Sequence, residues 1–441
     1  MGEDLGQLGW RGGLKYDSPE VVELRERCAP FLLLHRTQES DALRMCSDAA
    51  LFAPLTDGAL LALLRSLAAK GGMSPAEQEE LVVDPAKPGF AKRAAALLNR
   101  DGHVIVKNVL DAERLAKIRA GLEPVIRKVV ELDPERLGNR GSHRYSFGNL
   151  ESIEQQEAWA ALADPPILME VLAEIFETED FVCRDTMGGA DFVLPGALDF
   201  QHLHSDGGRG QKGEYPDVKL GTRTDGSTFW QALDVEEDPA CTYRVVNQRE
   251  LPASHLNLTA NWPMEVGGED PQGQTALNGA TRQIAGTQSK DGIVNYLEEP
   301  LEMKMAMVAP APAGSALIRD TRAWHGGCPN VSRYVRAIPR TGYSAQIYQQ
   351  ADPNTPPRKV KPGLTRMKHE VWETLTPKGK EICAHLKMDE GEVLEPVDID
   401  ISEGLTAGGP GSNKVELGFV HTLDGFKNTA GQADRYTIAK L

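Results

Sequence analysis

The sequence predicts an α+β protein with a mainly β core, because three different patterns follow one another along the chain. Residues 18 to about 80 have helical patterning, whereas residues 181–349 form short β-rich runs separated by Gly, Pro and Asn. No helical pattern separates these runs, so an antiparallel sandwich or barrel is expected. Residues 351–441 begin rich in Pro and Lys and look irregular apart from one helix.

The N-terminal segment contains two helix-start signals. Ser18-Pro19 and Ser74-Pro75 each place a serine as the cap and a proline in the first turn. Between them, residues 59–67 are strongly apolar. We interpret residues 1–88 as an N-terminal helical extension whose helices serve packing.

The central region begins with a helix that ends at Gly102, followed by a strand at His103–Val106. A second helix follows Asp111, which suits a cap. Its apolar residues recur at steps of three and four and predict one buried stripe: Leu115, Ile118, Leu122, Val125 and Val129. Pro124 lies inside this pattern and is expected to kink the helix or end its first half.

The remaining strands come from short β-rich runs, namely Thr228–Leu233, Thr242–Val246, Met303–Val308, Gly314–Asp320 and Tyr334–Ile347. We therefore place the β domain at residues 89–350. A helix is expected at Pro377–Leu386, within a C-terminal extension, residues 351–441, that packs on the core.

Composition excludes several functions. The 441 residues carry a formal net charge of −16, which disfavours general binding to nucleic acid or anionic membranes. No apolar run approaches the roughly 18 residues that a membrane span needs. We therefore expect a small-molecule substrate, no nucleic acid, no membrane span, and a monomer or homodimer.

The cysteines and the two ends of the sequence bear on the cellular compartment in which the protein is expected. The six cysteines are scattered and form no Cys-x-x-Cys pair, as expected of buried thiols in a reducing compartment. The acidic start of the chain does not resemble a secretory signal. Ala439-Lys440-Leu441 differs from the peroxisomal Ser-Lys-Leu signal only at its first, small position. We expect an intracellular protein, cytoplasmic or peroxisomal.

Candidate metal ligands begin with His204 and Asp206. Residues two apart on a strand point the same way, so an imidazole and a carboxylate can face one point. His202 shares this orientation and remains an alternative. By itself a His-x-Asp pair is usually structural, and its significance depends on what lies further along the chain.

The third candidate ligand is His325, which follows Asp206 by 119 positions and precedes Arg336 by eleven. Two histidines and one carboxylate can occupy one face of an octahedral iron and leave three positions open. A turn centred near Pro329 would place Arg336 diagonally across from His325, about 7–8 Å away. Arginine suits a distal carboxylate, so this pattern favours an iron(II) oxygenase that consumes 2-oxoglutarate.

Three longer motifs carry a family resemblance. They are Arg100–Leu110, Phe229–Asp238 leading to Leu251-Pro-Ala-Ser-His255, and Trp324–Arg336. Together they resemble the phytanoyl-CoA dioxygenase family of iron(II)/2-oxoglutarate enzymes, over about Phe90 to Tyr348. The resemblance implies a double-stranded β-helix (jelly roll) with flanking helices.

The resemblance also implies roles for particular residues. His204, Asp206 and His325 would bind Fe(II), and Arg336 would pair with the distal carboxylate of 2-oxoglutarate. O2 would be the second co-substrate, and ascorbate is a candidate reductant. By alignment, the further residues expected to line the co-substrate pocket are Met187 and Trp230, with Arg144 as a second cation.

The expected activity is that of a 2-oxoglutarate-dependent non-haem iron dioxygenase, which oxidises a C–H bond of a small organic substrate and releases succinate and carbon dioxide. Halogenating relatives lack the carboxylate at Asp206, so hydroxylation, desaturation or ring closure is favoured. Two departures stand out: Gly327 replaces a small hydroxyl residue of the family, and Ala253 replaces a glycine.

Two other classes of function stay open at this stage. One is another metal-dependent enzyme on a cupin-like barrel, such as a zinc or manganese hydrolase or isomerase. The other is a catalytically silent family member that acts as a binding protein. The spacing of Arg336 argues against the first, and the intact set of ligands argues against the second.

Overall fold

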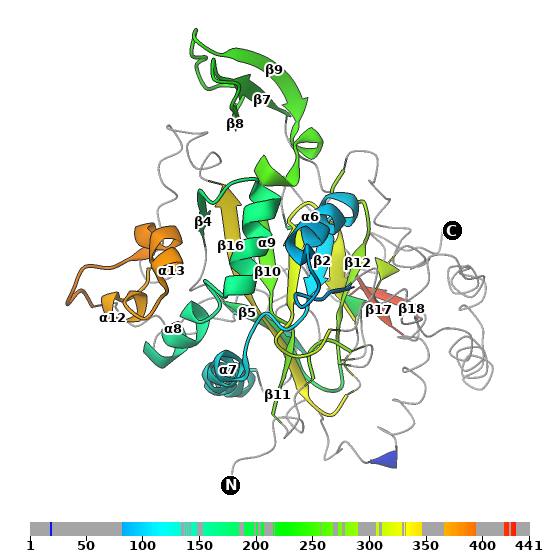
Figure 1. Cartoon of the computed structure of the whole chain (residues 1–441). Coiled ribbons are helices and arrows are strands. Elements are labelled where there is room, and N and C mark those ends of the chain that lie inside the picture. Colours follow the sequence, from blue (N-terminus) through cyan, green and yellow to red (C-terminus); the bar gives the residue numbers. More distant parts are fainter. Residues whose placement is uncertain are drawn as a thin grey trace.

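The structure is a computed structural model. It describes residues 18–19, 82–133, 136, 138, 140, 143–147, 153–184, 189–197, 200–201, 204–206, 215, 217–255, 257–267, 272–275, 278–289, 306–307, 311–328, 330, 332–345, 366–393, 419–422 and 425–428. Its centre is a nine-stranded, largely antiparallel sheet with helices on one face (Figure 1).

The main sheet is built around β16 (Val335–Ala345), its longest strand. The order of its main path is β1 (Val82–Val83), β2 (His103–Val106), β14 (Ala316–Asp320), β10 (Asn257–Asn261), β16, β5 (Ala190–Val193) and β3 (Arg144–Phe147). β4 (Phe181–Cys183) and β11 (Met264–Val266) also pair with β16. All pairings are antiparallel except β1 with β2.

Alternation along the strands separates a helix-facing side of this sheet from a polar side. Ala316 and Ile318 of β14 belong to the main apolar core, as do the odd-numbered Val335, Ala337 and Tyr343 of β16. Since successive side chains point to opposite faces, the residues between them face away from the helices. These are Arg319 on β14, Thr259 and Asn261 on β10, and Arg336, Ile338 and Arg340 on β16.

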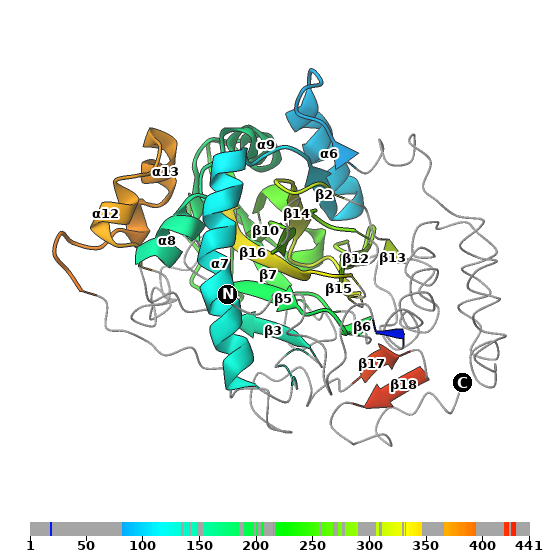
Figure 2. The ribbon, with the colours of Figure 1, turned by 90° about the horizontal axis from the view of Figure 1, so that it is seen from below.

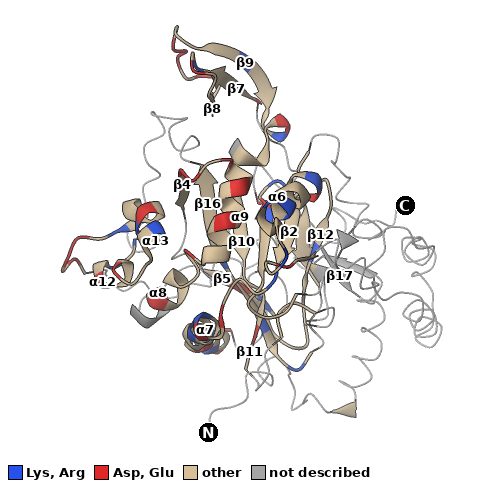
Figure 3. Cartoon of the chain, viewed as in Figure 1, with Lys and Arg blue, Asp and Glu red and all other residues tan. Residues whose placement is uncertain are grey.

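The helices that cover the apolar face are α6 (Phe90–Asp101), α7 (Ala112–Leu132), α8 (Ile153–Ala160) and α9 (Pro166–Phe176). α6 ends at Gly102, whose positive φ of 77° suits glycine. Asp111 caps α7 as expected, accepting a bond from the Arg114 N–H at 2.8 Å. Figure 2 shows α7 lying along the side of the sheet, and Figure 3 shows that it carries charges of both signs.

Three smaller sheets complete the described strands. β12 (Thr281–Ile284) lies between β13 (Ala306–Met307) and β15 (His325–Gly327). β6 (Phe200–Gln201) pairs with β17 (Phe419–Thr422), which pairs with β18 (Gly425–Asn428). β7 (Asp217–Thr222), between β8 (Thr228–Gln231) and β9 (Thr242–Asn247), forms an arm that projects beyond the main sheet (Figure 1).

Two expectations about helices need correction. Pro124 does not end the first half of its helix, because α7 is continuous across it; the buried stripe on both sides of Pro124 outweighs one lost backbone hydrogen bond. The expected helix at residues 377–386 is divided into α13 (Pro377–Ile382) and a 3₁₀ turn, η5 (Ala384–Leu386). Of the expected N-terminal helices, nearly the whole of residues 18–80 lies outside the described part.

The part of the C-terminal region at residues 366–393 packs against the helices. Its short helix α12 (His369–Trp372) and α13 contribute Val371 and Ile382 to the same apolar core as the main sheet. The proposed boundaries at 88 and 350 remain predictions. No helix in the described part of the chain is long and apolar enough to cross a membrane.

Leu122 tests the stripe of α7. It is fully buried, whereas Leu132 on the same helix is 45% exposed. We expect Leu122→Ala to lower the free energy of unfolding by about 2–5 kcal/mol, because it removes buried methyl groups and leaves a cavity. Leu132→Ala is the matched control and should change stability by less than about 0.5 kcal/mol. Urea denaturation measures both, and equal losses would contradict the packing described.

Candidate metal centre

His204, Asp206 and His325 converge on one point. The Nε2 atom of His204 lies 3.7 Å from Oδ1 of Asp206, and Nε2 of His325 lies 3.6 Å from the same oxygen. The two imidazole centroids are 4.3 Å apart. The three candidate ligand atoms lie within 4.8 Å of one another. Residues far apart in the sequence therefore form one compact donor set.

Backbone pairing brings the three residues together. His204 and His325 face each other across an antiparallel bridge, and each N–H donates to the other residue's carbonyl at 2.9 Å. The Asp206 N–H donates to the carbonyl of Thr321, also at 2.9 Å. The chain from 204 to 206 thus runs antiparallel to 321–325, and alternation turns both of its candidate ligands the same way.

The donor set fits a divalent metal ion. Imidazole nitrogen and carboxylate oxygen bind such ions at about 2.1 Å, so two donors sharing one ion cannot lie more than about 4.2 Å apart. The two separations to Asp206, 3.6 and 3.7 Å, satisfy this limit, and the widest separation in the set, up to 4.8 Å, closes to it with a shift of about 0.6 Å in one side chain. Two histidines and one carboxylate suit iron(II) with open positions, although other divalent ions accept the same donors.

Arg319 on β14 contacts two of the three candidate ligands. Its Nη2 donates to Oδ2 of Asp206 at 2.7 Å, and its Nη1 lies 2.6 Å from Nδ1 of His325. Partial burial opposes ionisation of Asp206, but the charge of Arg319, with those of His325 and His204 when these rings are protonated, outweighs it and lowers the pKa of this carboxyl. Asp206 is therefore an anion at neutral pH.

His325 is neutral at neutral pH. Burial first, and then the charge of Arg319, lower its pKa well below the usual value. Its Nδ1 lies 3.1 Å from the carbonyl of Ala323. In the tautomer where Nδ1 donates to that carbonyl, Nε2 keeps its lone pair and faces Asp206 and His204. That tautomer is the one a metal requires, and in it Nη1 of Arg319, which can only donate, must move away from its 2.6 Å approach to Nδ1.

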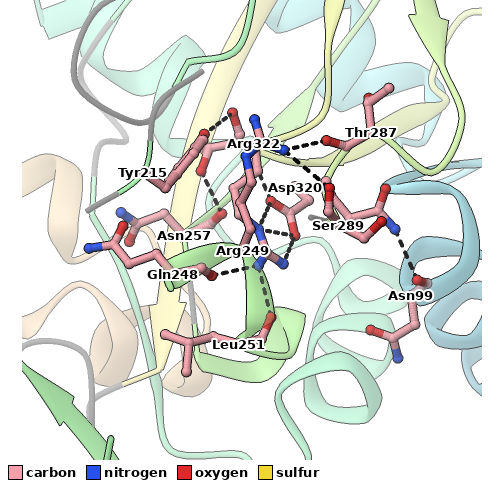
Figure 4. Close-up of polar contacts among 12 residues, drawn as sticks. Asn99, Tyr215, Gln248, Arg249, Leu251, Asn257, Thr287, Ser289, Asp320 and Arg322 are labelled. Atoms are coloured by element: carbon pink, nitrogen blue, oxygen red, sulfur yellow. Dashed lines mark hydrogen bonds and ion pairs between the residues drawn. The ribbon is translucent and has the colours of Figure 1, made fainter. Parts of the chain in front are cut away.

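A buried polar cluster fixes the segment between β14 and β15 (Figure 4). Arg322 forms a bidentate ion pair with Asp320, and it donates to the backbone carbonyls of Gln248 and Leu251 at 2.9 and 2.8 Å. Both charges are almost fully buried, so each depends on the other. The cluster holds residues 320–322 against η3 (Gln248–Glu250) and thus fixes the start of the segment that leads to His325.

A second group of cations lies in the same pocket, on β16 and β3. The side chains of Arg336 and Arg144 are 3% and 4% exposed. Arg336 donates to the carbonyl of Gly279 and Arg144 to that of Cys328. Burial, and then the charge of Arg144, lower the pKa of Arg336 to about 9. Within the described part of the chain, Nε and Nη1 of Arg336 have no hydrogen-bond partner, so this part of the pocket favours an anion.

Gly327 is explained by its neighbours. A Cβ at this position would lie 2.7 Å from Nη1 of Arg144 and 3.4 Å from Oε1 of Gln201. The Gly327 N–H donates to that same Gln201 oxygen at 3.1 Å. The space of a side chain at 327 is therefore taken by the guanidinium of Arg144. The departure from the family pattern at 327 goes together with an arginine at 144.

The expected hairpin between His325 and Arg336 is wrong. β15 pairs with β12, whereas β16 pairs with β10, β11, β4 and β5. Arg336 lies opposite Glu265 and Val193 rather than diagonal to His325. The two residues still line one pocket, because their strands belong to different sheets that both border it.

Of the other residues expected in the site, some line this pocket and some do not. Arg144 lines the pocket with the candidate ligands. Trp230 is on β8, packed against the small cluster of Val218, Leu220, Val246 and Leu251, and is not among the residues that line this pocket. Met187 and His202 lie outside the described residues. Arg319 was missed, although the alternation of Ala316, Ile318 and Arg319 could have placed a charge on the polar face of β14.

Comparison with known proteins gives only weak likenesses. No protein-family model matches the chain, and no curated protein does so significantly. EvdMO1 shares 16% identity, with 58% of this chain and 50% of EvdMO1 covered and a TM-score of 0.36. The chain thus spans half the length of that protein.

Two further solved structures are non-heme alpha ketoglutarate dependent enzymes of nogalamycin biosynthesis. The epimerase SnoN shares 16% identity over 58% of this chain and 83% of its own, with a TM-score of 0.34. It has also been solved with Fe3+, alpha ketoglutarate and nogalamycin RO. The carbocyclase SnoK shares 15% identity over 57% of this chain and 83% of its own, with a TM-score of 0.32. Scores this low do not establish a shared fold, so a functional conclusion depends on the geometry.

The triad predicts one divalent metal site per chain. We expect the protein to bind one equivalent of Fe(II), Co(II) or Zn(II), and His204→Ala to weaken binding by at least about 100-fold, since loss of a second-shell partner alone costs 10–100-fold. Anaerobic titration measures the affinity. His369→Ala, which changes a histidine outside the triad, is the control and should bind metal like the wild type. Unchanged affinity in His204→Ala would contradict the site.

Proposed function

We propose that the protein is an iron(II)- and 2-oxoglutarate-dependent dioxygenase that oxidises, most simply by hydroxylation, a C–H bond of a small organic substrate. The single observation that carries this proposal is the pairing of a two-histidine, one-carboxylate donor set with two buried arginines in one pocket. A hydrolytic zinc site would not need buried guanidinium groups set back from the metal. A keto diacid needs both features.

The chain's residues divide the work between the two ends of the pocket. His204, Asp206 and His325 would hold iron(II). Arg336, aided by Arg144, would bind the distal carboxylate of 2-oxoglutarate, whose other end chelates the metal. When bound, the iron supplies the redox chemistry that couples decarboxylation of 2-oxoglutarate, giving succinate and carbon dioxide, to oxidation of the substrate.

Burial of Arg336 and Arg144 strengthens their attraction for a carboxylate. Arg336 is held among its neighbours by one backbone carbonyl and is destabilised by desolvation and by Arg144. A carboxylate placed between the two guanidinium groups would satisfy the unpaired Nε and Nη1 atoms and relieve their mutual repulsion. The pocket is thus pre-organised for an anion, which reduces the cost of ordering on binding.

The proposed fold and family follow from the same arrangement. We infer that the main sheet and the β12–β13–β15 sheet are the two halves of a double-stranded β-helix, in which ligands from one half face the arginine of the other. The sequence motifs favour the phytanoyl-CoA dioxygenase family. Supporting observations are the helices on one face of the main sheet and the site on the other.

The decisive experiment is an anaerobic titration of the Fe(II)-loaded protein with 2-oxoglutarate, followed by a screen for substrates that stimulate succinate release. We expect a metal-to-ligand charge-transfer band that saturates with one equivalent of 2-oxoglutarate. Glutarate, which lacks the keto group, is the matched control and should give no band. A zinc or manganese hydrolase, or a silent binding protein, would give neither the band nor oxygen-dependent succinate.

Arg336 should dominate the affinity for 2-oxoglutarate. Removing one partner of a buried charge pair costs about 3–5 kcal/mol, so Arg336→Ala should raise the 2-oxoglutarate requirement by about two to three orders of magnitude. The same titration measures this effect. Arg333→Ala, which removes an exposed arginine just before the strand, should have no effect. Wild-type affinity in Arg336→Ala would show that the residue is misplaced.

Gly327 tests the contribution of Arg144. In Gly327→Ala the new methyl group must displace the guanidinium of Arg144, so we expect affinity for 2-oxoglutarate to fall about tenfold, or about 1.4 kcal/mol. In an Arg144→Ala background the same change should cost little, because contacting residues are not additive. An equal loss in both backgrounds would mean that Gly327 acts by another route.

A further inference from the structure

Arg319 occupies an unusual place for a positive charge. It is 4% exposed and lies on the polar face of β14, directly opposite His103 on β2 and Thr259 on β10. Burying an unpaired guanidinium costs several kcal/mol, so its position requires a compensating anion. Asp206, at 2.7 Å, is the carboxylate that it contacts.

The contact uses one particular oxygen of Asp206. Oδ2 accepts from Nη2 of Arg319, whereas Oδ1 faces the Nε2 atoms of His204 and His325. The other terminal nitrogen of Arg319 lies 2.6 Å from Nδ1 of His325, on the side of the ring away from Nε2. In the tautomer that metal binding requires, Nδ1 carries a proton and cannot accept from Arg319, so the contact with Oδ2 of Asp206 is the one that carries the argument, and it leaves Oδ1 clear.

We propose that Arg319 is a positioning residue that reserves a single oxygen of Asp206 for the metal. This inference rests on the proposed metal site and extends it. A carboxylate can bind a metal through one oxygen or through both. With Oδ2 held by Arg319, only Oδ1 is available.

The consequence concerns the co-substrate. A donor set of three leaves three of six octahedral positions open, which is what a chelating keto acid and O2 require. A carboxylate that used both oxygens would fill a fourth position and leave only two, so 2-oxoglutarate and O2 could no longer bind together. Arg319 therefore keeps room for both co-substrates without touching either.

A purely structural role makes a different prediction. If Arg319 only fills space and stabilises the sheet, its loss should lower the melting temperature and weaken metal and 2-oxoglutarate binding together. If it reserves Oδ2, its loss should leave metal binding unchanged or tighter, because Asp206 gains a free oxygen. Only the affinity of the metal-loaded, 2-oxoglutarate-bound protein for a ligand at the position of O2 should then fall.

The test compares Arg319→Met and Arg319→Lys with the wild type. Methionine is flexible and fills the same space without a donor, whereas lysine keeps one donor for Oδ2. Leu317→Ala is the matched control, because Leu317 is buried on the same face of the same strand in a separate apolar cluster. Each protein is loaded with Co(II), whose visible absorption weakens as its coordination number rises, and is then saturated with 2-oxoglutarate and titrated with azide, which takes the position of O2.

We expect Arg319→Met to show weaker Co(II) absorption than the wild type and, with 2-oxoglutarate bound, to bind azide at least about tenfold more weakly, with Co(II) affinity retained. Arg319→Lys should restore the wild-type spectrum, and Leu317→Ala should lower the melting temperature without changing the spectrum. A wild-type spectrum and azide affinity in Arg319→Met would overturn the proposal. So would a spectral change of equal size in Leu317→Ala.

Two safeguards keep the result interpretable. If Arg319→Met is recovered unfolded, Arg319→Lys decides, because its retained contact with Oδ2 requires a wild-type spectrum, and a changed spectrum would reject the proposal. The Co(II) measurement needs no 2-oxoglutarate. The role of Arg319 can therefore fail while the wild type still binds 2-oxoglutarate, and it can hold even if the wild type binds none.

Discussion

The bridge between His204 and His325 is the constraint on which the rest of the site depends. Two backbone hydrogen bonds of 2.9 Å join segments that are 121 residues apart, from 204 to 325. Closing a loop of that length costs entropy that two bonds alone would not offset. The main sheet, its helices and the buried Asp320–Arg322 pair supply the remainder, so the stability of the whole core is what holds two imidazoles at one point.

Charge is distributed unevenly between the surface and the pocket. The chain has a formal net charge of −16, yet the pocket is lined by five arginines, at positions 140, 144, 319, 336 and 340, and by only two acids, Asp191 and Asp206. Three of the arginines, at 144, 319 and 336, are buried, and desolvation strengthens their interactions with an anion relative to those of charges on the solvated surface. Iron(II) would add further positive charge, so a dianion such as 2-oxoglutarate meets a local field opposite in sign to that of the molecule as a whole.

Local pattern predicted much of the fold but not its long-range pairing. β-rich composition between turn residues identified the strands at 103–106, 314–320 and 334–347, and helical spacing identified the buried stripe of α7, because both depend on neighbours in the sequence. The hairpin joining His325 to Arg336 failed because a turn rule cannot show that two consecutive strands enter different sheets. Trp230 was assigned by alignment alone, and the arm that carries it packs on its own apolar cluster. Ligand chemistry restricts the residue types that can serve, so His204, Asp206 and His325 could be singled out in the sequence, and the structure brings them together; their role as ligands stays a prediction.

Arg319 and Gly327 show how one departure from a pattern can require another. A small hydroxyl residue at 327 cannot coexist with the observed position of the Arg144 guanidinium, since a Cβ there would lie 2.7 Å from it. A buried cation at 319 likewise cannot persist without the carboxylate at 206. The glycine at 327 can be explained only when the position of Arg144 is known, and the buried Arg319 only when the position of Asp206 is known. Substitutions at these four positions should therefore be tested in pairs, because the single changes expose a charge or a clash that the native pair never presents.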